Sequence, residues 1–170
     1  VVRYPARFQL VLAANPCPCA PTDPRHCICS SLEKRRYLGK LSGPLLDRVD
    51  LRVLMHTVRA GAFAAEAAES SAKVRARVAH ARLAAADRWR PYGFTTNAEV
   101  TGAVLRRRFR LGVPVMAPLK TALERGLISI RGVDRSLRVA WTLADLAGRG
   151  TPDRDDVSVA LSFRQTEAIS

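Results

Sequence analysis

The sequence predicts a fragment of α/β sheet followed by an all-helical segment. Two short apolar runs, at residues 8–14 and 51–55, have the length and the flanking turn residues of buried strands. After about residue 60 the apolar residues recur instead at the three- and four-residue spacing of helices. We therefore expect a sheet fragment within residues 1–60, a linker and connecting helix in 61–96, and a helical domain in 97–170.

The expected sheet fragment carries all four cysteines between its two strands. The run at 8–14 is closed by Asn15-Pro16, which predicts a strand that ends at a turn. The stretch 16–31 is rich in proline and holds the cysteines, so we expect a loop or a small lobe there. Gly43-Pro44 predicts a further turn, which leads into the second strand.

The helical segment is expected to contain five helices, separated by glycine and proline. Ser70 or Ser71 and Ser129 can cap the first and fourth of them, and Gly126 can end the third. Pro91 and Gly93 break the chain after the first helix. The five helices are expected at about residues 70–88, 97–108, 115–125, 129–148 and 153–163.

The charge balance indicates a partner that carries phosphates, or else a solvated basic face. Lysine and arginine total 28 against 15 acidic residues, which gives a net charge of +13. Most of these cations are arginines, whose guanidinium groups bind phosphate in a bidentate manner. The ordinary apolar and charged fractions exclude a disordered chain. No run approaches the roughly 18 apolar residues of a membrane span, and no secretory signal is present, so we expect a cytoplasmic protein without a membrane partner.

The cysteines form two closely spaced pairs, Cys17-Pro-Cys19 and Cys27-Ile-Cys29. Two such pairs across a short loop can place four thiolates around one tetrahedral Zn²⁺, and His26 could replace one sulfur. Four protein ligands leave no open position for water, which favours a structural over a catalytic zinc. Reduced cysteines without metal, or a disulfide, remain the alternatives, and the lack of a secretory signal disfavours the disulfide.

Several segments in combination resemble the magnesium-chelatase-like AAA+ family of the ComM/YifB type. They are FQLVLAANPCPC at 8–19, YLGKLSGPLLDRVDL at 37–51, and the helical segments ESSAKVR, ISIRGVDR and WTLADLAG. The resemblance runs from about residue 5 to Arg164. It implies part of a P-loop NTPase core with a cysteine-rich zinc lobe, followed by an all-α lid. It also implies a hexamer that uses ATP and Mg²⁺.

The resemblance also implies roles for two residues of the first part. Asn15 matches the sensor-1 residue, which helps to orient the attacking water, and an Asn that merely starts a turn is the alternative. Arg48 matches the arginine finger that one subunit supplies to its neighbour's nucleotide, where it stabilises charge on the transferring phosphoryl group. An ordinary ion pair of Arg48 with Asp47 or Asp50 is the alternative.

The lid is implied to supply a sensor-2 arginine to the bound nucleotide. Arg131, Arg135 and Arg138 lie on one face of the expected fourth helix, away from its apolar stripe. The resemblance selects Arg131 and leaves Arg135 and Arg138 as close competitors, with a solvated ridge as the alternative. A second basic group, Arg106, Arg107, Arg108 and Arg110, is interpreted as a solvated helix end rather than a nucleic-acid contact.

The family's nucleotide-holding motifs do not occur in these 170 residues. There is no GxxxxGK[ST] P-loop and no apolar strand ending in paired acids. We therefore expect the back half of an ATPase, inactive alone. In the ComM-like branch the implied work is translocation or branch migration on DNA, as a helicase in natural transformation. The alternatives are a magnesium-chelatase subunit and a non-catalytic, zinc-stabilised nucleic-acid-binding module.

Overall fold

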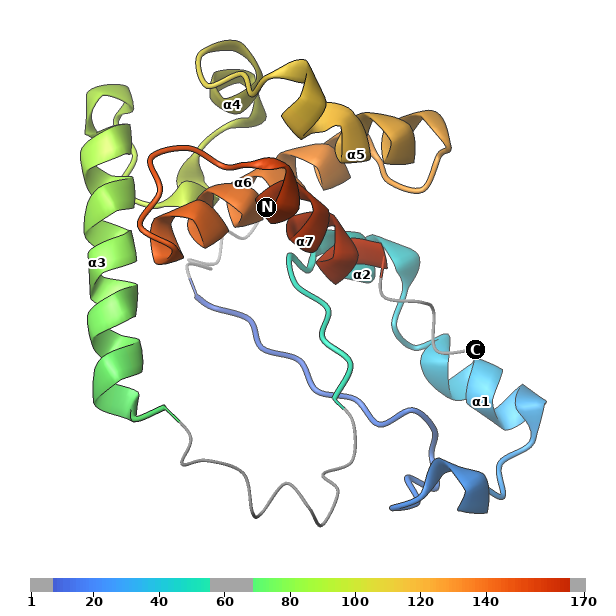
Figure 1. The fold of residues 1–170 in the computed structure, drawn as a ribbon. Helices are drawn as coiled ribbons and strands as arrows, with labels where there is room; N and C mark the ends of the chain where they lie inside the picture. The colour runs from blue at the N-terminus through green and yellow to red at the C-terminus, as the bar shows by residue number, and fades with distance from the viewer. Residues whose placement is uncertain (1–7, 56–68, 166–170) are drawn as a thin grey trace, which may run out of the picture. The chain divides into compact units, whose positions relative to one another are not determined.

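The computed structural model describes residues 8–55 and 69–165. The chain divides into two compact units, which hold the described residues 8–43 and, in the second, 44–55 with 69–165. All regular structure in the described residues is helical (Figure 1). The α-helices are α1 (Ser31–Leu38), α2 (Gly43–Arg48), α3 (Ser71–Trp89), α4 (Gly102–Arg107), α5 (Val113–Glu124), α6 (Ile130–Leu146) and α7 (Arg154–Gln165).

The prediction of two strands, at residues 8–14 and 51–55, is wrong: the structure shows no strand in either segment. Residues 8–14 and 51–55 are irregular, and their apolar side chains are exposed, 80% for Val11 and 83% for Met55. A strand forms only when a neighbouring strand takes up its N–H and C=O groups, and no described segment forms a strand beside either run. The cysteine cluster is present, as described below, whereas the α/β core stays a prediction.

Two helices of the first sixty residues were missed. Helix α1 begins with a capping box, in which the Glu33 N–H donates to Ser30 Oγ at 3.2 Å and the Ser30 N–H donates to Glu33 Oε2 at 2.8 Å. This Ser-x-x-Glu spacing is visible in the sequence and was a usable signal. In place of the expected turn at Gly43-Pro44, the six residues 43–48 form α2, since proline is tolerated in the first turn of a helix.

Four of the five helices expected after residue 60 are confirmed. Ser70 and Ser129 accept hydrogen bonds at the starts of α3 and α6, and Gly126 and Gly148 adopt left-handed φ angles of 69° and 70°. The expected helix at 97–108 is split into a 3-10 turn, Asn97–Glu99, and α4. Val100 lies between them in an extended conformation, and its carbonyl accepts a hydrogen bond from Arg138 Nε at 2.9 Å.

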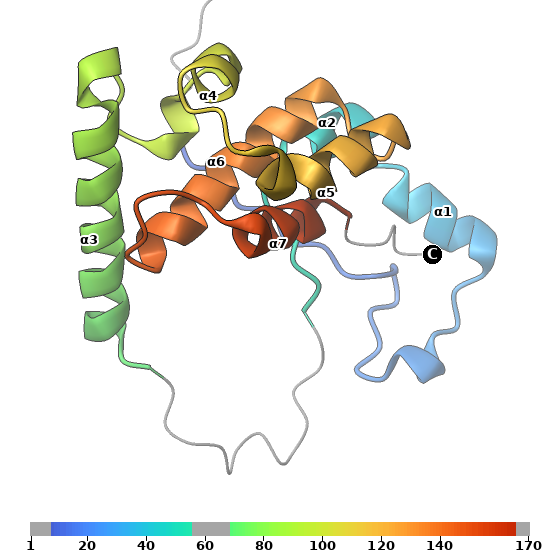
Figure 2. The ribbon, with the colours of Figure 1, turned by 45° about the horizontal axis from the view of Figure 1, so that its top comes forward.

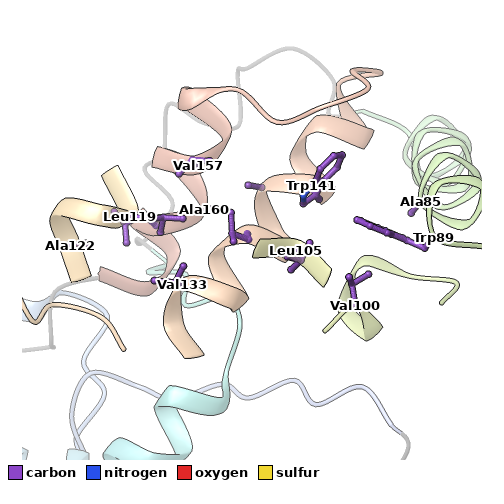
Figure 3. Close-up of a cluster of buried hydrophobic side chains, with 13 residues drawn as sticks. Ala85, Trp89, Val100, Leu105, Leu119, Ala122, Val133, Trp141, Val157 and Ala160 are labelled. Atoms are coloured by element: carbon purple, nitrogen blue, oxygen red, sulfur yellow. The ribbon is translucent and has the colours of Figure 1, made fainter. Parts of the chain in front are cut away.

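Helix α6 is the centre of the second unit. It packs against α3 and α7, and α5 packs against α7, as Figure 1 and Figure 2 show. The core contains Trp89 of α3 edge-on to Trp141 of α6, with ring centroids 5.5 Å apart (Figure 3). Leu119 and Val157 are fully buried at the other end of this core. This packing holds the arginine-bearing face of α6 in a fixed position.

Candidate metal centre and arginine cluster

The four cysteines meet in one cluster in the N-terminal unit. All four Sγ atoms lie within 4.8 Å of one another, and the thiols are free. The Cys17 Sγ atom is 3.5 Å from that of Cys19 and 3.5 Å from that of Cys27, and Cys19 Sγ is 3.7 Å from Cys27 Sγ. A short 3-10 turn, Pro24–His26, brings the second pair back to the first.

These separations fit a tetrahedral thiolate site. With metal–sulfur bonds of about 2.3 Å, tetrahedral geometry places the sulfur atoms about 3.8 Å apart. A set of four sulfur ligands suits zinc rather than Mg²⁺ or Ca²⁺, which prefer oxygen. His26 is not part of the cluster, so the alternative in which it replaces a sulfur is not favoured. The cluster can therefore bind a metal ion.

Hydrogen bonds to Cys19 favour its thiolate form. The Cys29 thiol and the Ile28 N–H both donate to Cys19, which lowers the pKa of Cys19 to about 7. The same interaction raises the pKa of Cys29 to about 12. Burial, followed by hydrogen bonds to its neighbours, raises the pKa of Cys17. A thiolate at Cys19 is the form that a metal ion would bind first.

Asn15 lies two residues before the cluster. It is exposed and directly precedes the bend at Pro16 and Cys17. Because residues 8–14 form no strand, Asn15 does not end a strand in the described residues. Its assignment as sensor 1 stays a prediction.

Arg48 is the last residue of α2, and its side chain is exposed. Its Nη1 donates to the Pro44 carbonyl at 2.8 Å, within its own helix. Among the described residues Arg48 forms no ion pair, because Asp47 and Asp50 are bound by other arginines. The alternative of an ion pair with either aspartate therefore does not hold in this structure.

The three arginines on α6 differ in how much they are engaged. Arg131 is 60% exposed, and its Nη1 lies 3.7 Å from Asp47 Oδ2. Arg135 is mostly buried and forms an ion pair with Asp50. Arg138 donates to the Val100 carbonyl, and burial, followed by the charge of Arg135, lowers its pKa. Arg135 and Arg138 are thus tied into the fold, whereas Arg131 is the most accessible of the three.

Arg164 on α7 belongs to this arginine cluster and was missed. Its side chain is 5% exposed, and its Nη2 lies 3.1 Å from Asp47 Oδ1. The available signal was its spacing: Val157, Ala160 and Leu161 are buried, and Arg164 follows at the next position of the same helix face. A cation placed on a buried face requires a partner, and here that partner is Asp47.

The exposed cations without a carboxylate partner concentrate in two places of the second unit. Arg106 pairs with Asp134, but Arg107, Arg108 and Arg110 are exposed and take part in none of the ion pairs between described residues. The same holds for Lys73, Arg75 and Arg82 on α3, which has no acidic residue before Asp87. Around the helix, Lys73 points to the side opposite to Arg75 and Arg82, so the three surround α3 rather than share one face. We call these three residues the α3 basic group. Among the described helices, none is long and apolar enough to cross a membrane.

Comparisons with known proteins identify the family. Residues 68–164 match the family described as magnesium chelatase, subunit ChlI C-terminal, and residues 1–63 match magnesium chelatase, subunit ChlI. An uncharacterized protein of Mycobacterium tuberculosis is 71% identical over 99% of this chain and 33% of its own length. No solved structure matches the chain.

Two more distant relatives have names that are more informative. The competence protein ComM of Haemophilus influenzae is 33% identical over 96% of this chain and 32% of its own length. The uncharacterized protein YifB of Escherichia coli is 34% identical over 99% of this chain and 33% of its own length. The chain thus spans about a third of the length of the curated relatives that it matches. It belongs to the magnesium-chelatase-like family of the ComM/YifB type.

Proposed function

We propose that this chain is the sensor, finger and lid portion of a hexameric AAA+ ATPase of the ComM-like type, which couples ATP hydrolysis to DNA translocation or branch migration in the cytoplasm. The observation that carries the proposal is the gathering of arginines around Asp47 and Asp50. Arg131 and Arg135 of α6 and Arg164 of α7 bind the two aspartates on either side of Arg48. Phosphoryl transfer depends on guanidinium groups held in fixed positions around the phosphates.

Each of the candidate residues has its own proposed role in ATP hydrolysis. Arg48 acts as the finger toward a neighbouring subunit, and its exposed side chain, which donates only to the Pro44 carbonyl of its own helix, supports that role. Arg131 is the sensor-2 residue, since its long contact with Asp47 is easily exchanged for a phosphate. Arg135 and Arg138 hold the lid in shape through Asp50 and the Val100 carbonyl. Asn15 orients the attacking water, and a P-loop elsewhere in the complete ATPase holds ATP and Mg²⁺.

ATP hydrolysis by the complete ATPase, meaning the polypeptide that joins these residues to a P-loop, tests the proposal directly. We expect hydrolysis that DNA stimulates, and no hydrolysis by the 170-residue chain alone, because it has no P-loop. Hydrolysis that responds to a porphyrin and Mg²⁺ but not to DNA would support the chelatase alternative. If the complete protein hydrolyses no ATP under either condition, the zinc-stabilised nucleic-acid-binding module becomes the better interpretation.

We assign DNA binding to the α3 basic group. Lys73, Arg75 and Arg82 have no carboxylate partner among the described residues, so their charges are available to phosphates. Contacts of this kind position a protein on DNA and read little sequence. We expect weak binding by the 170-residue chain, with a Kd that rises strongly between about 50 and 200 mM salt.

Two triple variants separate a local surface from net charge alone. Replacing Lys73, Arg75 and Arg82 by alanine should reduce the slope of log K against log salt by about 2 to 3, at roughly 0.9 for each lost phosphate contact on duplex DNA. The control replaces Arg77, Arg90 and Lys120, which pair with Glu69, Asp87 and Glu124 and lower the net charge equally. Equal losses in both variants would refute the assignment of DNA binding to the α3 basic group, and a Kd that stays flat with salt would refute phosphate binding altogether.

A further inference from the structure

Arg164 binds the backbone on both sides of Arg48. Its Nη1 donates to the Val49 carbonyl at 3.0 Å, and its Nη2 donates to the Asp47 carbonyl at 3.4 Å. The same Nη2 donates to Asp47 Oδ1 at 3.1 Å. One guanidinium group on α7 thus holds the residue before Arg48 and the residue after it, more than a hundred positions away in the chain.

A second link supports the same segment. The Arg52 N–H donates to the Phe163 carbonyl at 3.0 Å, directly before Arg164 in the chain. Arg52 Nη2 donates to the Leu46 carbonyl at 3.0 Å. The end of α2 and the residues that follow it are therefore fixed against the end of α7 by two arginines.

Stability alone does not explain a buried arginine at this position. The Arg164 side chain is 5% exposed, and its Nε is buried without a hydrogen-bond partner among the described residues. Burial lowers the pKa of Arg164, Asp47 raises it, and the charges of Arg52 and Arg135 lower it again. Replacing a buried ion pair by apolar side chains is often neutral or stabilising, so such a group is retained at a cost.

Helix α6 leaves room for this guanidinium group. Gly132 faces Arg164, and a Cβ atom at this position would lie 3.4 Å from Arg164 Nε and 3.2 Å from Ile128 Cβ. The distance to Ile128 is the tight one, whereas 3.4 Å from Arg164 Nε is an ordinary van der Waals contact. The absence of a side chain at Gly132 therefore lets the Arg164 guanidinium group lie close to α6.

We infer that Arg164 is a positioning residue for Arg48: it fixes the backbone on both sides of Arg48 and so sets the direction in which that side chain leaves α2. The inference rests on the proposed finger role of Arg48. A guanidinium group displaced by about 1 Å from a transferring phosphoryl group can cost roughly 10²-fold in rate. Arg164 itself touches no nucleotide and acts only through the finger.

The consequence is a specific pattern of complementation between subunits of the complete ATPase. We expect Arg164→Met to reduce kcat about 10²-fold while nucleotide binding is retained. In mixed hexamers with a P-loop-dead variant, hydrolysis should be partly restored, because some sites combine an intact P-loop with an intact finger. In mixed hexamers with Arg48→Ala, hydrolysis should not be restored, because neither subunit supplies a working finger.

The opposite pattern would overturn the inference. If Arg164 served the nucleotide of its own subunit, Arg164→Met would be restored by Arg48→Ala and not by the P-loop-dead variant. Arg154→Met is the matched control, since Arg154 lies exposed on the same helix, and its kcat should stay at the wild-type value. A wild-type kcat for Arg164→Met would overturn the inference as well.

A second variant covers a failure of Arg164→Met to assemble. Arg164→Lys keeps the charge, but a single ammonium group at the end of a flexible stem cannot reproduce the planar fork that binds Asp47 and Val49 together. The Arg164→Lys variant should show the same complementation pattern as Arg164→Met, and a wild-type kcat would overturn the inference.

The Arg48→Ala variant separates a failure of this inference from a failure of the proposed function. If Arg48→Ala itself hydrolyses ATP at the wild-type rate, the proposed finger role of Arg48 is wrong. If Arg48→Ala is inactive and only the Arg164 pattern fails, the positioning role alone is wrong.

Discussion

Replacing Arg48 by alanine in the complete ATPase should reduce kcat for ATP hydrolysis about 10³-fold, the lower end of the effect of an arginine finger. The side chain is exposed, and its Nη1 donates only to the Pro44 carbonyl of the same helix. Truncation therefore removes little packing, and the melting temperature and nucleotide Kd should stay close to those of the wild type. Steady-state kinetics, nucleotide titration and thermal melting measure the three quantities.

Mixing of subunits shows whether Arg48 acts on a neighbour's nucleotide. Arg48→Ala combined with a P-loop-dead variant should regain part of the activity that each lacks alone, because mixed interfaces pair one intact finger with one intact P-loop. Arg125→Ala is the control, since Arg125 is an exposed arginine at the end of α5 that no role has been proposed for. If Arg48→Ala hydrolyses ATP at the wild-type rate, Arg48 is an ordinary surface residue and its proposed role as an arginine finger is wrong.

The helices after residue 60 could be predicted because their signals are local. Ser70 and Ser129 cap α3 and α6 through N–H groups three residues away, and Gly126 marks the end of α5. The one misplaced helix depends on a distant contact. Val100 is extended there, and its carbonyl accepts from Arg138, 38 positions later. No spacing rule within 97–108 contains that information.

The strands could not be predicted from the apolar runs alone. An apolar run indicates a preference for burial, but a strand also requires a neighbour that is in register with it. The apolar side chains at 8–14 and 51–55 remain exposed, and the Arg52 N–H donates to the carbonyl of Phe163 in α7, which is a helix and not a strand. The sequence pattern therefore identified two apolar segments that favour burial, but it predicted the wrong secondary structure for them.

The candidate site also has one part that the sequence could predict, the cysteine cluster, and one part that it could not, the partners of the arginines. The four cysteines lie within thirteen consecutive residues, so their spacing was enough to predict that they meet. The partners of the arginines are far away in the chain: Arg164 meets Asp47 across 117 positions, and Arg135 meets Asp50 across 85. Charge and helix face predicted that Arg131, Arg135 and Arg138 share one side of α6. They did not predict that Asp47 and Asp50 bind Arg131, Arg135 and Arg164.

Replacing Cys17 and Cys19 together by serine should release a bound zinc ion and unfold much of the N-terminal unit. Among the described residues 8–43 whose burial is known, only Cys17 is buried, so this unit has almost no hydrophobic core. Small domains without a core depend on a metal or on disulfides, and the four thiols here are free. We expect about one zinc ion per chain and the loss of it in the variant, together with a melting transition lowered by more than about 10 °C.

The control for this double variant is His26→Ala, because His26 lies in the loop between the cysteine pairs but outside the sulfur cluster. Its zinc content and melting temperature should match those of the wild type, which would also exclude His26 as a ligand.

Metal analysis of protein purified without added zinc, together with thiol titration, decides between a bound zinc ion and reduced cysteines without metal. Less than about half an equivalent of zinc with four freely titrating thiols would show reduced cysteines without metal. A double variant that retains zinc and melts like the wild type would show that Cys17 and Cys19 do not hold the ion. In either case the order of this unit would have to come from its turns and from the capped helix α1, which buries no side chain.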